Sequence, residues 1–347
     1  MNSFGRLFRI TIFGESHGES VGVNIDGCPA GLPLGVEDFL PDLERRKGGT
    51  QKGTTPRKED DLPIFKSGVF NGRATGAPIT ILFENNNTRS GDYEKQRAVP
   101  RPGHADFVAN RKFGGFEDFR GGGHFSGRLT VALVAAGVIA KKLVAAATRV
   151  DAQGSPASGN AGANVRATIL EIGGEPDLEK GLQKAIDEKD TIGGIVECRV
   201  SGLPVGLGEP FFDSVESSIS HAVFAIPAIR GIEFGTGFAA ARMFGSEHND
   251  AIEDQNGRTR SNHAGGVVGG ITNGNELVFR IAVKPTSSTP REQQTLNWET
   301  GEVGPFSVKG RHDLCIALRV PVVLEAVTAV VLADLLLLEQ RINRIFP

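Results

Sequence analysis

Cysteine is scarce in this sequence: only Cys28, Cys198 and Cys315 occur among 347 residues, and they lie far apart. No CxxC pair is present, so the sequence indicates neither a thiolate zinc site nor a disulfide framework. Isolated thiols of this kind are typical of proteins in a reducing compartment. We therefore expect three buried free thiols and no metal site.

Long hydrophobic runs are also scarce. Residues 129–140 are too few to cross a bilayer, and the apolar stretch 327–338 is interrupted by Asp334. The N-terminus lacks the apolar core of a signal peptide. The net charge of −3 does not favour nucleic-acid binding. These features predict a soluble cytoplasmic protein that binds neither membrane nor nucleic acid.

Glycine, in contrast, is abundant: the chain has 46 glycines in 347 residues, about 13 % against a usual ~7 %. Many of them stand in residues 14–35, which follow an alternating stretch, 7–13, that predicts a strand. Because this strand ends at Gly14, Ser16 and His17 are expected on a tight turn that a ligand can approach closely. The turn is therefore our first candidate for a reactive site.

Two common motifs are matched only in part. Residues 14–18 fit the G-x-S-x-G nucleophile elbow of serine hydrolases, but the elbow requires a helix directly after the serine. Here residues 19–27 predict a strand and a turn. Gly121 and Gly123, before a helix, weakly match a dinucleotide-binding fingerprint, yet no apolar strand precedes them. A serine hydrolase and a Rossmann domain stay open as disfavoured alternatives.

The remaining pattern mixes helices and strands. The expected elements are helices at 37–47, 126–147 and 320–345 and a hairpin formed by 64–70 and 78–83. Ser126 is expected to cap the second helix. Residues 84–123 are polar and irregular, and 151–163 are small enough to form a linker.

The chain also appears as two similar halves. Residues 26–32 resemble 201–207, and residues 67–72 resemble 269–274. Each half ends in a long helix that is apolar almost all round, which suggests burial on both sides. Chance similarity between turns rich in glycine and proline is the alternative explanation.

This organisation predicts an α+β fold with a β-α-β sandwich architecture. Two largely antiparallel sheets would enclose a layer of long helices. Residues 1–347 would form a single domain with an internal pseudo-twofold repeat, whose halves are about 1–150 and 190–347.

Histidine and arginine gather in the same loops. Five of the seven histidines lie in segments rich in glycine or arginine: His17, His104, His124, His263 and His312. Their spacing is not that of metal ligands, which favours acid–base roles. Neighbouring arginines would form a pocket for a polyanion if folding gathered them, and a scattered surface set is the alternative: Arg45, Arg46, Arg101, Arg120, Arg128 and Arg311.

Taken together, the motifs carry a resemblance that covers nearly the whole chain. In order, they are GESHG with DGCPAGLPL, DLERRKGGTQKGTT, TRSGDY, RPGHAD, RGGGHFSGR, SNHAGGVVGGI, KPTSS and GRHDLC. This series resembles the chorismate synthase family. The resemblance implies a homotetrameric lyase of aromatic amino acid biosynthesis that eliminates phosphate from 5-enolpyruvylshikimate 3-phosphate. It also implies dependence on reduced FMN and a β-α-β sandwich with internal pseudosymmetry.

The resemblance further implies roles for individual residues. His17 would be the acid for the leaving phosphate, His104 would lie beside the flavin, and Asp313 with Ser126 would relay a proton at the flavin N5. The implied substrate-binding residues are Arg45, Arg46, Lys52 and Arg128. The implied FMN contacts are His124, Phe125, Ser126, Ala228, Gly269, Lys284, Pro285, Thr286, Ser287, Ser288 and Arg311.

One stretch departs from the common family pattern. His124 and Phe125 stand where many members have an arginine and a serine, which affects the implied side-chain contacts to FMN. Some members reduce flavin themselves with NADPH, whereas we expect this chain to depend on an external flavin reductase. A flavin-binding or polyanion-binding protein without catalysis is the alternative from a different functional class.

Overall fold

The computed structural model describes residues 1–49, 51–57, 59–87, 97–149, 162–308 and 312–340. Near the N-terminus, five strands form an antiparallel sheet in the order β1-β2-β3-β7-β4. Its strands are β1 (Ser3–Phe4), β2 (Arg9–Gly14), β3 (Ser20–Asp26), β4 (Ile64–Ser67) and β7 (Ile79–Glu84). Val21, Val23 and Ile25 occupy alternate positions of β3 and are buried, so one face of this sheet lies on the core.

A second antiparallel sheet is built from the later part of the chain, in the order β10-β13-β9-β8. Its strands are β8 (Asn164–Ile172), β9 (Gly194–Ser201), β10 (Ile229–Phe234) and β13 (Leu277–Val283). Three two-stranded hairpins accompany the sheets: β5 (Val69–Phe70) with β6 (Arg73–Ala74), β11 (Val267–Val268) with β12 (Ile271–Thr272), and β14 (Gln293–Leu296) with β15 (Val303–Phe306). The structure thus has the mixed α+β class that the sequence predicts.

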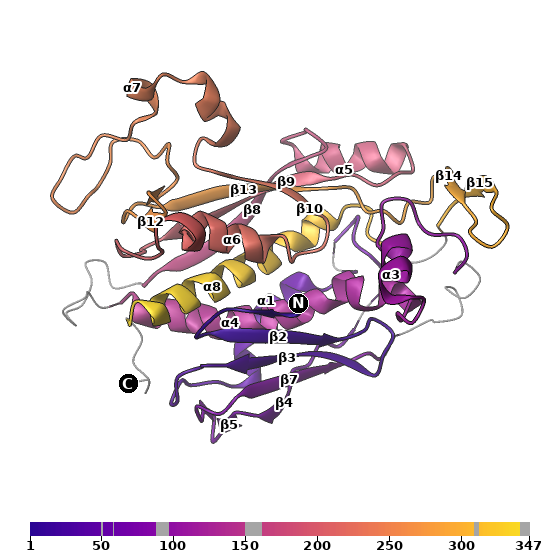
Figure 1. The fold of residues 1–347 in the computed structure, drawn as a ribbon, viewed down its shortest axis with the longest axis horizontal. Helices are drawn as coiled ribbons and strands as arrows, with labels where there is room; N and C mark the ends of the chain where they lie inside the picture. Colours follow the sequence, from indigo (N-terminus) through magenta and orange to yellow (C-terminus); the bar gives the residue numbers. More distant parts are fainter. Residues whose placement is uncertain (50, 58, 88–96, 150–161, 309–311, 341–347) are drawn as a thin grey trace.

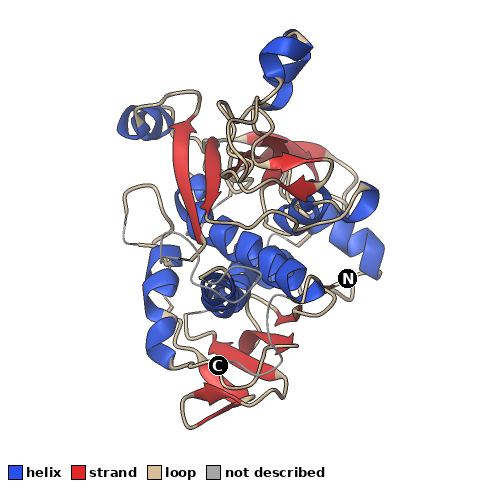
Figure 2. Ribbon diagram, turned by 90° about the vertical axis from the view of Figure 1, so that its left-hand side faces the viewer, coloured by secondary structure: helices blue, strands red, loops and turns tan. Residues whose placement is uncertain are grey.

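Two long helices lie between the two sheets, as Figures 1 and 2 show. They are α4 (Thr130–Ala147) and α8 (Val320–Leu338), and nearly all of their apolar side chains are buried. The helices approach closely at Gly137, where an added Cβ would overlap Ala326. Helix α8 ends before the expected residue 345, and residues 341–347 lie outside the described part of the chain.

Both long helices are apolar enough to span a membrane by length and composition, over residues 127–147 and 316–338. However, 78 % and 89 % of the two apolar windows are buried inside the protein. Their composition is that of core helices packed between sheets. The cysteines share this core: Cys28, Cys198 and Cys315 are buried, unpaired thiols, and burial raises the pKa of the Cys28 thiol to about 12.

Shorter helices lie around the two sheets and the long helices (Figure 1). They are α1 (Leu40–Arg46), α3 (Asp106–Phe113), α5 (Leu178–Asp187), α6 (Val215–Val223) and α7 (Gly245–His248). Helix α1 follows a 3₁₀ turn, Val36–Asp38, so the expected helix at 37–47 is present in two pieces. The expected linker at 151–163 falls almost entirely outside the described residues.

Helix α3 corrects the expectation that residues 84–123 are irregular throughout. Asp106 occupies its first turn, and Gly114 ends it with a left-handed φ of 64°. Only Ala109 of this helix is buried. With so little apolar surface to bury, the segment lacks the helical hydrophobic period that would have revealed it.

Candidate active site

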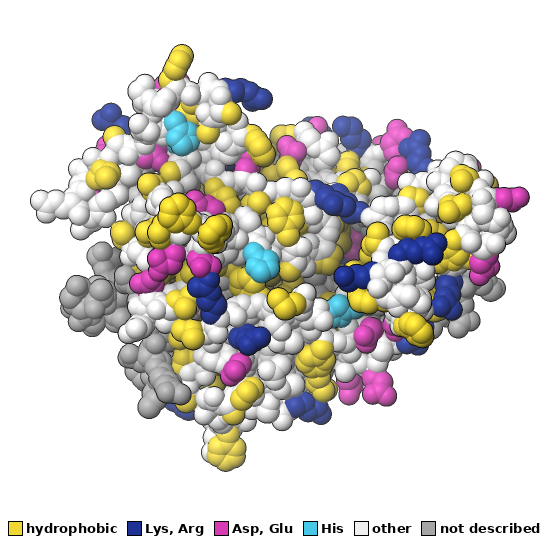
Figure 3. Space-filling view, in the orientation of Figure 1, with side chains coloured by type: hydrophobic (Ala, Val, Ile, Leu, Met, Phe, Trp, Pro, Cys, Tyr) yellow, Lys and Arg dark blue, Asp and Glu magenta, His cyan; other side chains and the backbone are white. Residues whose placement is uncertain are grey.

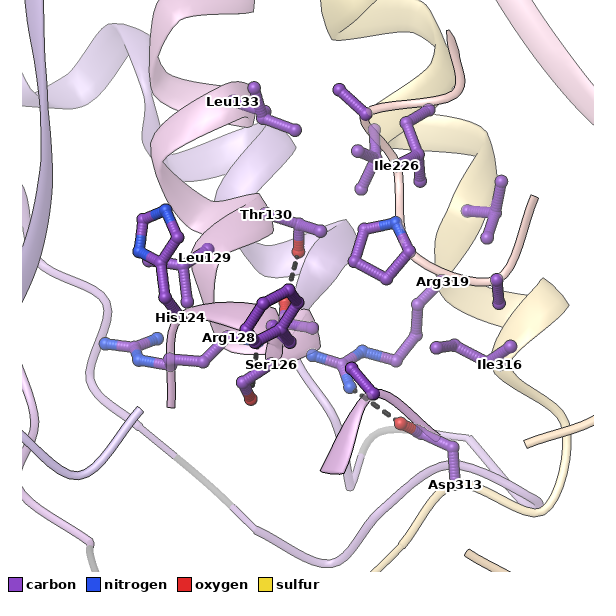
Figure 4. Close-up of a pocket in the computed structure, with 18 of the residues that line it drawn as sticks. His124, Ser126, Arg128, Leu129, Thr130, Leu133, Ile226, Asp313, Ile316 and Arg319 are labelled. Atoms are coloured by element: carbon purple, nitrogen blue, oxygen red, sulfur yellow. Dashed lines mark hydrogen bonds and ion pairs between the residues drawn. The ribbon is translucent and has the colours of Figure 1, made fainter. Parts of the chain in front are cut away.

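A pocket of about 960 Å³ opens between the two sheets, at the N-terminal ends of α4 and α8. Figure 4 shows Ser126, Arg128 and Thr130 at the start of α4, facing Ile316 and Arg319 at the start of α8. Figure 3 shows histidine and basic side chains near the middle of the face drawn. Polar groups gather at one end of the pocket, and apolar residues such as Leu133 and Ile226 line the other.

The turn after β2 contributes Ser16 and His17, as the sequence predicts. Gly14 has a φ of 98°, which glycine adopts easily, and the Ser16 amide donates to the Gly123 carbonyl at 3.1 Å. Both side chains are buried. Burial, followed by the charges of Arg57 and Arg120, lowers the pKa of His17 below 6.5. The imidazole is therefore mainly neutral at pH 7 when no ligand is bound.

The glycine run after Arg120 passes between two histidines. Gly121, Gly122 and Gly123 all have positive φ, at 61°, 81° and 51°. An added Cβ on Gly121 would overlap the His17 ring, and one on Gly122 would lie 3.1 Å from Cε1 of His104. The absence of side chains here therefore lets His17 and His104 approach the loop from its two sides. Packing against the two histidines accounts for the glycine run, so a bound dinucleotide is not needed to explain it.

His104 belongs to a hydrogen-bonded group on the loop before α3. Its Nδ1 lies 2.6 Å from Oδ1 of Asp106, and Arg101 makes a double contact to the same carboxylate at 2.7 and 2.8 Å. Burial opposes ionisation of Asp106, but Arg101 and His104 outweigh it and hold its pKa well below the usual range. Nδ1 faces both Asp106 and, at 3.1 Å, the Arg101 guanidinium, so Nε2 is the nitrogen left for other partners.

His312, whose role the sequence left open, also lines this pocket. Burial and then the charge of Arg101 lower its pKa to about 4. It is therefore neutral at pH 7.

His124, Phe125 and Ser126 lie together at the pocket wall. His124 bridges two oxygens, with Nδ1 2.8 Å from the Gly14 carbonyl and Nε2 3.1 Å from Oδ1 of Asn2. Phe125 packs on Phe113 with a ring separation of 6.3 Å. Ser126 accepts a 3.3 Å hydrogen bond from the Arg128 amide, as the cap of the short turn before α4. Their implied contacts to FMN stay a prediction.

The two arginines Arg46 and Arg128 meet at one buried carboxylate. Oδ2 of Asp61 accepts from Arg46 at 2.6 Å, and Oδ1 pairs with Arg128. Arg46 also donates to the Thr130 hydroxyl at 3.2 Å. All of these residues line the pocket, and the substrate-binding role of Arg46 and Arg128 stays a prediction.

Asp313 lies beside Arg319, near the start of α8 (Figure 4). Its Oδ1 accepts from the Thr55 amide at 2.8 Å, and its Oδ2 accepts from Arg319 at 3.0 Å. Arg319 also donates to the Arg46 carbonyl at 2.8 Å. Arg319 therefore links Asp313 to the backbone of α1, and the proton-relay role of Asp313 stays a prediction.

Lys284, Pro285, Thr286, Ser287 and Ser288 follow β13 and line the pocket beside the His104 loop. The Lys284 ammonium donates to the Gly103 carbonyl and to the Ser287 hydroxyl, both at 2.7 Å. Burial lowers the pKa of Lys284. Ser288 accepts from Arg101 at 3.1 Å. The structure thus brings this stretch against the loop that carries Arg101, Gly103 and His104, which is distant in sequence.

Ala228, another implied flavin contact, also lines the pocket and accepts from the Lys284 amide at 2.9 Å.

Three implied site residues lie outside the pocket in the chain described here. Arg45 points from α1 to Glu325, with two hydrogen bonds of 2.7 Å. Lys52 is exposed and donates to Gln183 at 3.0 Å. Gly269 lies at the turn between β11 and β12. A fourth residue, Arg311, is outside the described residues.

Sequence reasoning missed Arg57, Glu59, Asp61 and Arg319, all of which line the pocket. Arg57 donates to Oε1 of Glu59 at 2.6 and 2.9 Å and to the Ser16 hydroxyl at 3.1 Å. The sequence gives no local signal that singles them out, because all five residues from 57 to 61 are charged.

Within the described parts of the chain, no group of three His, Cys, Asp or Glu side chains could hold a metal ion. The polar end of the pocket is instead dominated by guanidinium groups and histidines. Such groups bind phosphate and carboxylate and can transfer protons. The arrangement therefore suits acid–base chemistry on an anionic substrate.

Comparisons with known proteins agree with this chemistry. A family model described as chorismate synthase matches residues 8–337. A chorismate synthase of Chitinophaga pinensis is 73 % identical over 346 residues, covering 100 % of this chain and 99 % of the relative. One from Dehalococcoides mccartyi is 46 % identical, covering 97 % and 96 %.

A solved structure gives the same result. The crystal structure of a chorismate synthase superposes with a TM-score of 0.71 at 26 % identity, covering 97 % of this chain and 93 % of that one. Sequence and structure thus point to the same group of lyases. The chain therefore belongs to the chorismate synthase family, whose enzymes serve aromatic amino acid biosynthesis in the shikimate pathway.

Proposed function

We propose that this pocket eliminates phosphate from 5-enolpyruvylshikimate 3-phosphate in an anti 1,4 sense to give chorismate, and that it does so with reduced FMN. One observation carries the proposal. Two histidines flank the Gly121–Gly123 run in a pocket whose floor is formed by Arg46 and Arg128. Proton-transfer groups and anion-binding groups therefore face the same space.

The substrate carries a phosphate and two carboxylates, so its binding requires several cations. Arg46 and Arg128 are our candidates for holding these anions, because guanidinium binds both groups through paired N–H donors. Arg57 and Arg319 line the same pocket, each paired with a carboxylate, Glu59 or Asp313. Arg45 and Lys52 could bind substrate only after leaving their present partners, so we do not include them.

The pocket also fits a flavin mononucleotide. Its volume of about 960 Å³ lies at the upper end of the range for ligand sites. Ile226 and Ala228 supply apolar wall for a ring system, while Lys284 supplies a cation and Thr286 a buried hydroxyl without a partner among the described residues. We propose that these residues, with Phe125, hold FMN.

Each catalytic residue then has a defined task. When bound, reduced flavin supplies electron density to the breaking carbon–oxygen bond and receives it back. His17 donates a proton to the leaving phosphate, once the phosphate has raised the pKa of the imidazole. His104, oriented by Asp106 at 2.6 Å, holds a proton at its Nδ1. Asp313 and Ser126 move the proton taken from the substrate ring.

The decisive assay combines purified protein, FMN reduced by dithionite, and substrate under nitrogen. Chorismate absorbance and phosphate release should rise together, in equal amounts. A protein that binds FMN and substrate without releasing phosphate would be a non-catalytic binder, and the proposal would be wrong. Reactions without protein and without dithionite are the controls.

We further propose that the chain contains an internal repeat of two similar halves. Each half contributes four strands to one sheet. Their spatial order is β2-β3-β7-β4 in the first half and β8-β9-β13-β10 in the second, so corresponding strands occupy the same places. Each half then continues into a long core helix, α4 or α8. This correspondence supports one β-α-β sandwich domain whose second half includes β8 and therefore begins near residue 164, earlier than the predicted 190.

We also propose a homotetramer in the cytoplasm. Large apolar side chains stand exposed on the part of the chain around α6 and α7, and Figure 3 shows hydrophobic atoms on this lobe. Phe211, Phe212, Phe238 and Phe244 are each at least 78 % exposed. Such surface is typical of interfaces between protein chains. Light scattering at several protein concentrations would measure the assembly.

A further inference from the structure

The segment from Arg57 to Asp61 lays charged side chains into the pocket wall. Arg57, Glu59 and Asp61 line the pocket, whereas Asp60 is exposed. Asp61 is the most enclosed of them, with 0 % of its side chain exposed. Its φ of 51° lies in the left-handed region, which residues other than glycine seldom adopt, although aspartate and asparagine tolerate it best. A buried charge in an uncommon backbone conformation is unfavourable unless specific contacts compensate for it.

The contacts of the Asp61 carboxylate supply that reason. One oxygen accepts from the Arg46 guanidinium at 2.6 Å, and the other pairs with the Arg128 guanidinium. Arg46 ends α1, and Arg128 precedes α4, so the carboxylate joins two elements that are 82 residues apart in sequence.

Burial makes this carboxylate necessary to the pair. The side chains of Arg46 and Arg128 are only 3 % and 4 % exposed, so water screens their mutual repulsion poorly. Burial alone would raise the pKa of the Asp61 carboxyl, but the two arginines outweigh it and hold that pKa below its usual range. Asp61 is therefore ionised at neutral pH and compensates one of the two positive charges.

Both arginines keep donors for a ligand. Arg128 uses its other nitrogens on Oδ1 of Asn85 at 2.9 Å and the Glu84 carbonyl at 3.2 Å. Each of its terminal nitrogens carries two hydrogens, so one remains on each. Arg46 donates to Thr130 and Asp61, and its Nε has no partner among the described residues. The pair thus retains a net positive charge and unused N–H groups beside the pocket.

We propose that Asp61 is a positioning residue, which holds the Arg46 and Arg128 guanidiniums together as one clamp for an anionic group, phosphate or carboxylate, of the substrate. The inference rests on the proposed function, because that function supplies the anionic substrate. Asp61 itself does not contact the anion. It sets the distance and direction of the two groups that do.

Asp61→Asn tests this role cleanly. Asparagine keeps the shape and tolerates the left-handed backbone, but it removes the charge and replaces one of the two acceptor oxygens with an NH2 donor. If Asp61 merely diluted the positive charge of the pocket, the variant would bind every anion more tightly. If Asp61 positions the clamp, the variant should bind substrate at least tenfold more weakly despite its additional positive charge. Asp60→Asn, at the exposed neighbouring position, is the matched control and should bind as the parent does.

Calorimetric titration with 5-enolpyruvylshikimate 3-phosphate, without flavin, measures this affinity independently of turnover. Competition by inorganic phosphate and by shikimate separates the two kinds of anion: the competitor whose affinity falls in Asp61→Asn is the one the clamp holds. If the parent binds substrate more tightly than Asp61→Asn but makes no chorismate, the proposed function is wrong, while the proposed role of Asp61 still holds. Unchanged or tighter substrate binding in a folded Asp61→Asn variant overturns the inference.

Asp61→Glu covers the case in which Asp61→Asn does not fold. It retains the charge and moves the carboxylate outward by one methylene group. The proposal expects this folded variant to lose at least tenfold in substrate affinity, because the guanidiniums shift. Parent-like affinity for substrate and both competitors would show that charge compensation alone is the role of Asp61.

Discussion

The ring of His17 packs directly on Gly121, so closely that a Cβ at position 121 would overlap Nδ1 and Cε1 of the imidazole. The Ser16 hydroxyl also lies nearby, 3.0 Å from that hypothetical Cβ. The glycine run therefore fixes the depth at which the histidine sits in the pocket. Position 121 therefore requires glycine for two reasons. A side chain would overlap His17, and the φ of 61° is unfavourable for other residues.

His17→Ala should slow phosphate release by about 10²–10⁴-fold, the usual loss for a positioned acid. Substrate should still bind, because Arg46 and Arg128 are untouched. Single-turnover phosphate release and substrate titration measure the two quantities separately. His248→Ala, in α7 and outside the pocket, is the control and should match the parent. A His17→Ala rate within a few-fold of the parent would remove His17 from the mechanism.

The pH dependence of catalysis should carry the signature of the same histidine. Because burial and the neighbouring arginines lower the pKa of His17 below 6.5, the protonated form is lost early as pH rises. The kcat/KM of the parent, which reports the free enzyme, should therefore decline from below pH 6.5. The decline of kcat should come at higher pH, because the bound phosphate raises the pKa. Rate profiles of His17→Ala that keep both declines would assign them to another group.

Neighbouring arginines on α1 show where sequence reasoning reaches its limit. The sequence pattern predicted the helix, whereas the family resemblance implied that both Arg45 and Arg46 bind substrate. Successive residues on a helix point about 100° apart, so only one of the two can face the pocket. Which of them does so depends on Glu325, a partner 280 residues away in sequence.

That partner forms a buried charge network between α1, α4 and α8. Glu325 is 3 % exposed and accepts from Arg45 and Lys141 at 2.7 Å and from the Ala167 amide at 3.0 Å. Glu325→Gln should lower the free energy of unfolding at pH 7 by about 1–3 kcal/mol, because charged hydrogen bonds to a buried carboxylate are lost while the part-exposed Arg45 and Lys141 keep Asp42 as a partner. Urea unfolding measures this, and Glu339→Gln, at the exposed end of the same helix, should have no such effect.

The parent and Glu325→Gln should also differ in how their free energy of unfolding changes at acidic pH. Burial opposes ionisation of Glu325, but Arg45 and Lys141 outweigh it, so the pKa in the folded state is below 4.5. The unfolded state then binds more protons near pH 4, and the stabilisation present above pH 4.5 is lost as pH falls through the lower folded value. The parent should lose this increment below pH 4.5, whereas Glu325→Gln should not. Parallel acid curves for the two proteins would contradict the network.

Gly137→Ala should destabilise the core although alanine favours helices by ~1 kcal/mol over glycine. An added Cβ would overlap Cα and Cβ of Ala326, so α4 and α8 would have to move apart. Thermal unfolding should show a lower midpoint than the parent. Gly245→Ala, at the start of α7, meets nothing within 4 Å and is the control. A stabilised Gly137→Ala protein would show that the helices adjust freely.

The overall class of the fold could be predicted because burial leaves a pattern of apolar residues in the sequence. Apolar residues occupy every second position of β3, and they run almost continuously through α4 and α8. The histidines of the site were found because His17, His104 and His124 stand among glycines. Glu59 and Asp61 were missed because their importance comes from arginines that only folding brings near. Charged residues in an irregular segment give no local sign of burial, so this part of the site required the structure.

The final prediction concerns the source of reduced flavin. In the described residues, every pair of strands is antiparallel, and none forms the parallel βαβ unit that binds nicotinamide dinucleotides in Rossmann folds. The glycine run 121–123 is occupied in packing against His17 and His104. NADPH would thus have to enter the substrate pocket itself. Protein with oxidised FMN, NADPH and substrate, kept dark under nitrogen, should therefore make no chorismate, and adding dithionite should start turnover. Steady NADPH oxidation with chorismate formation, in a preparation whose His17→Ala counterpart shows no background reductase, would instead identify a bifunctional enzyme.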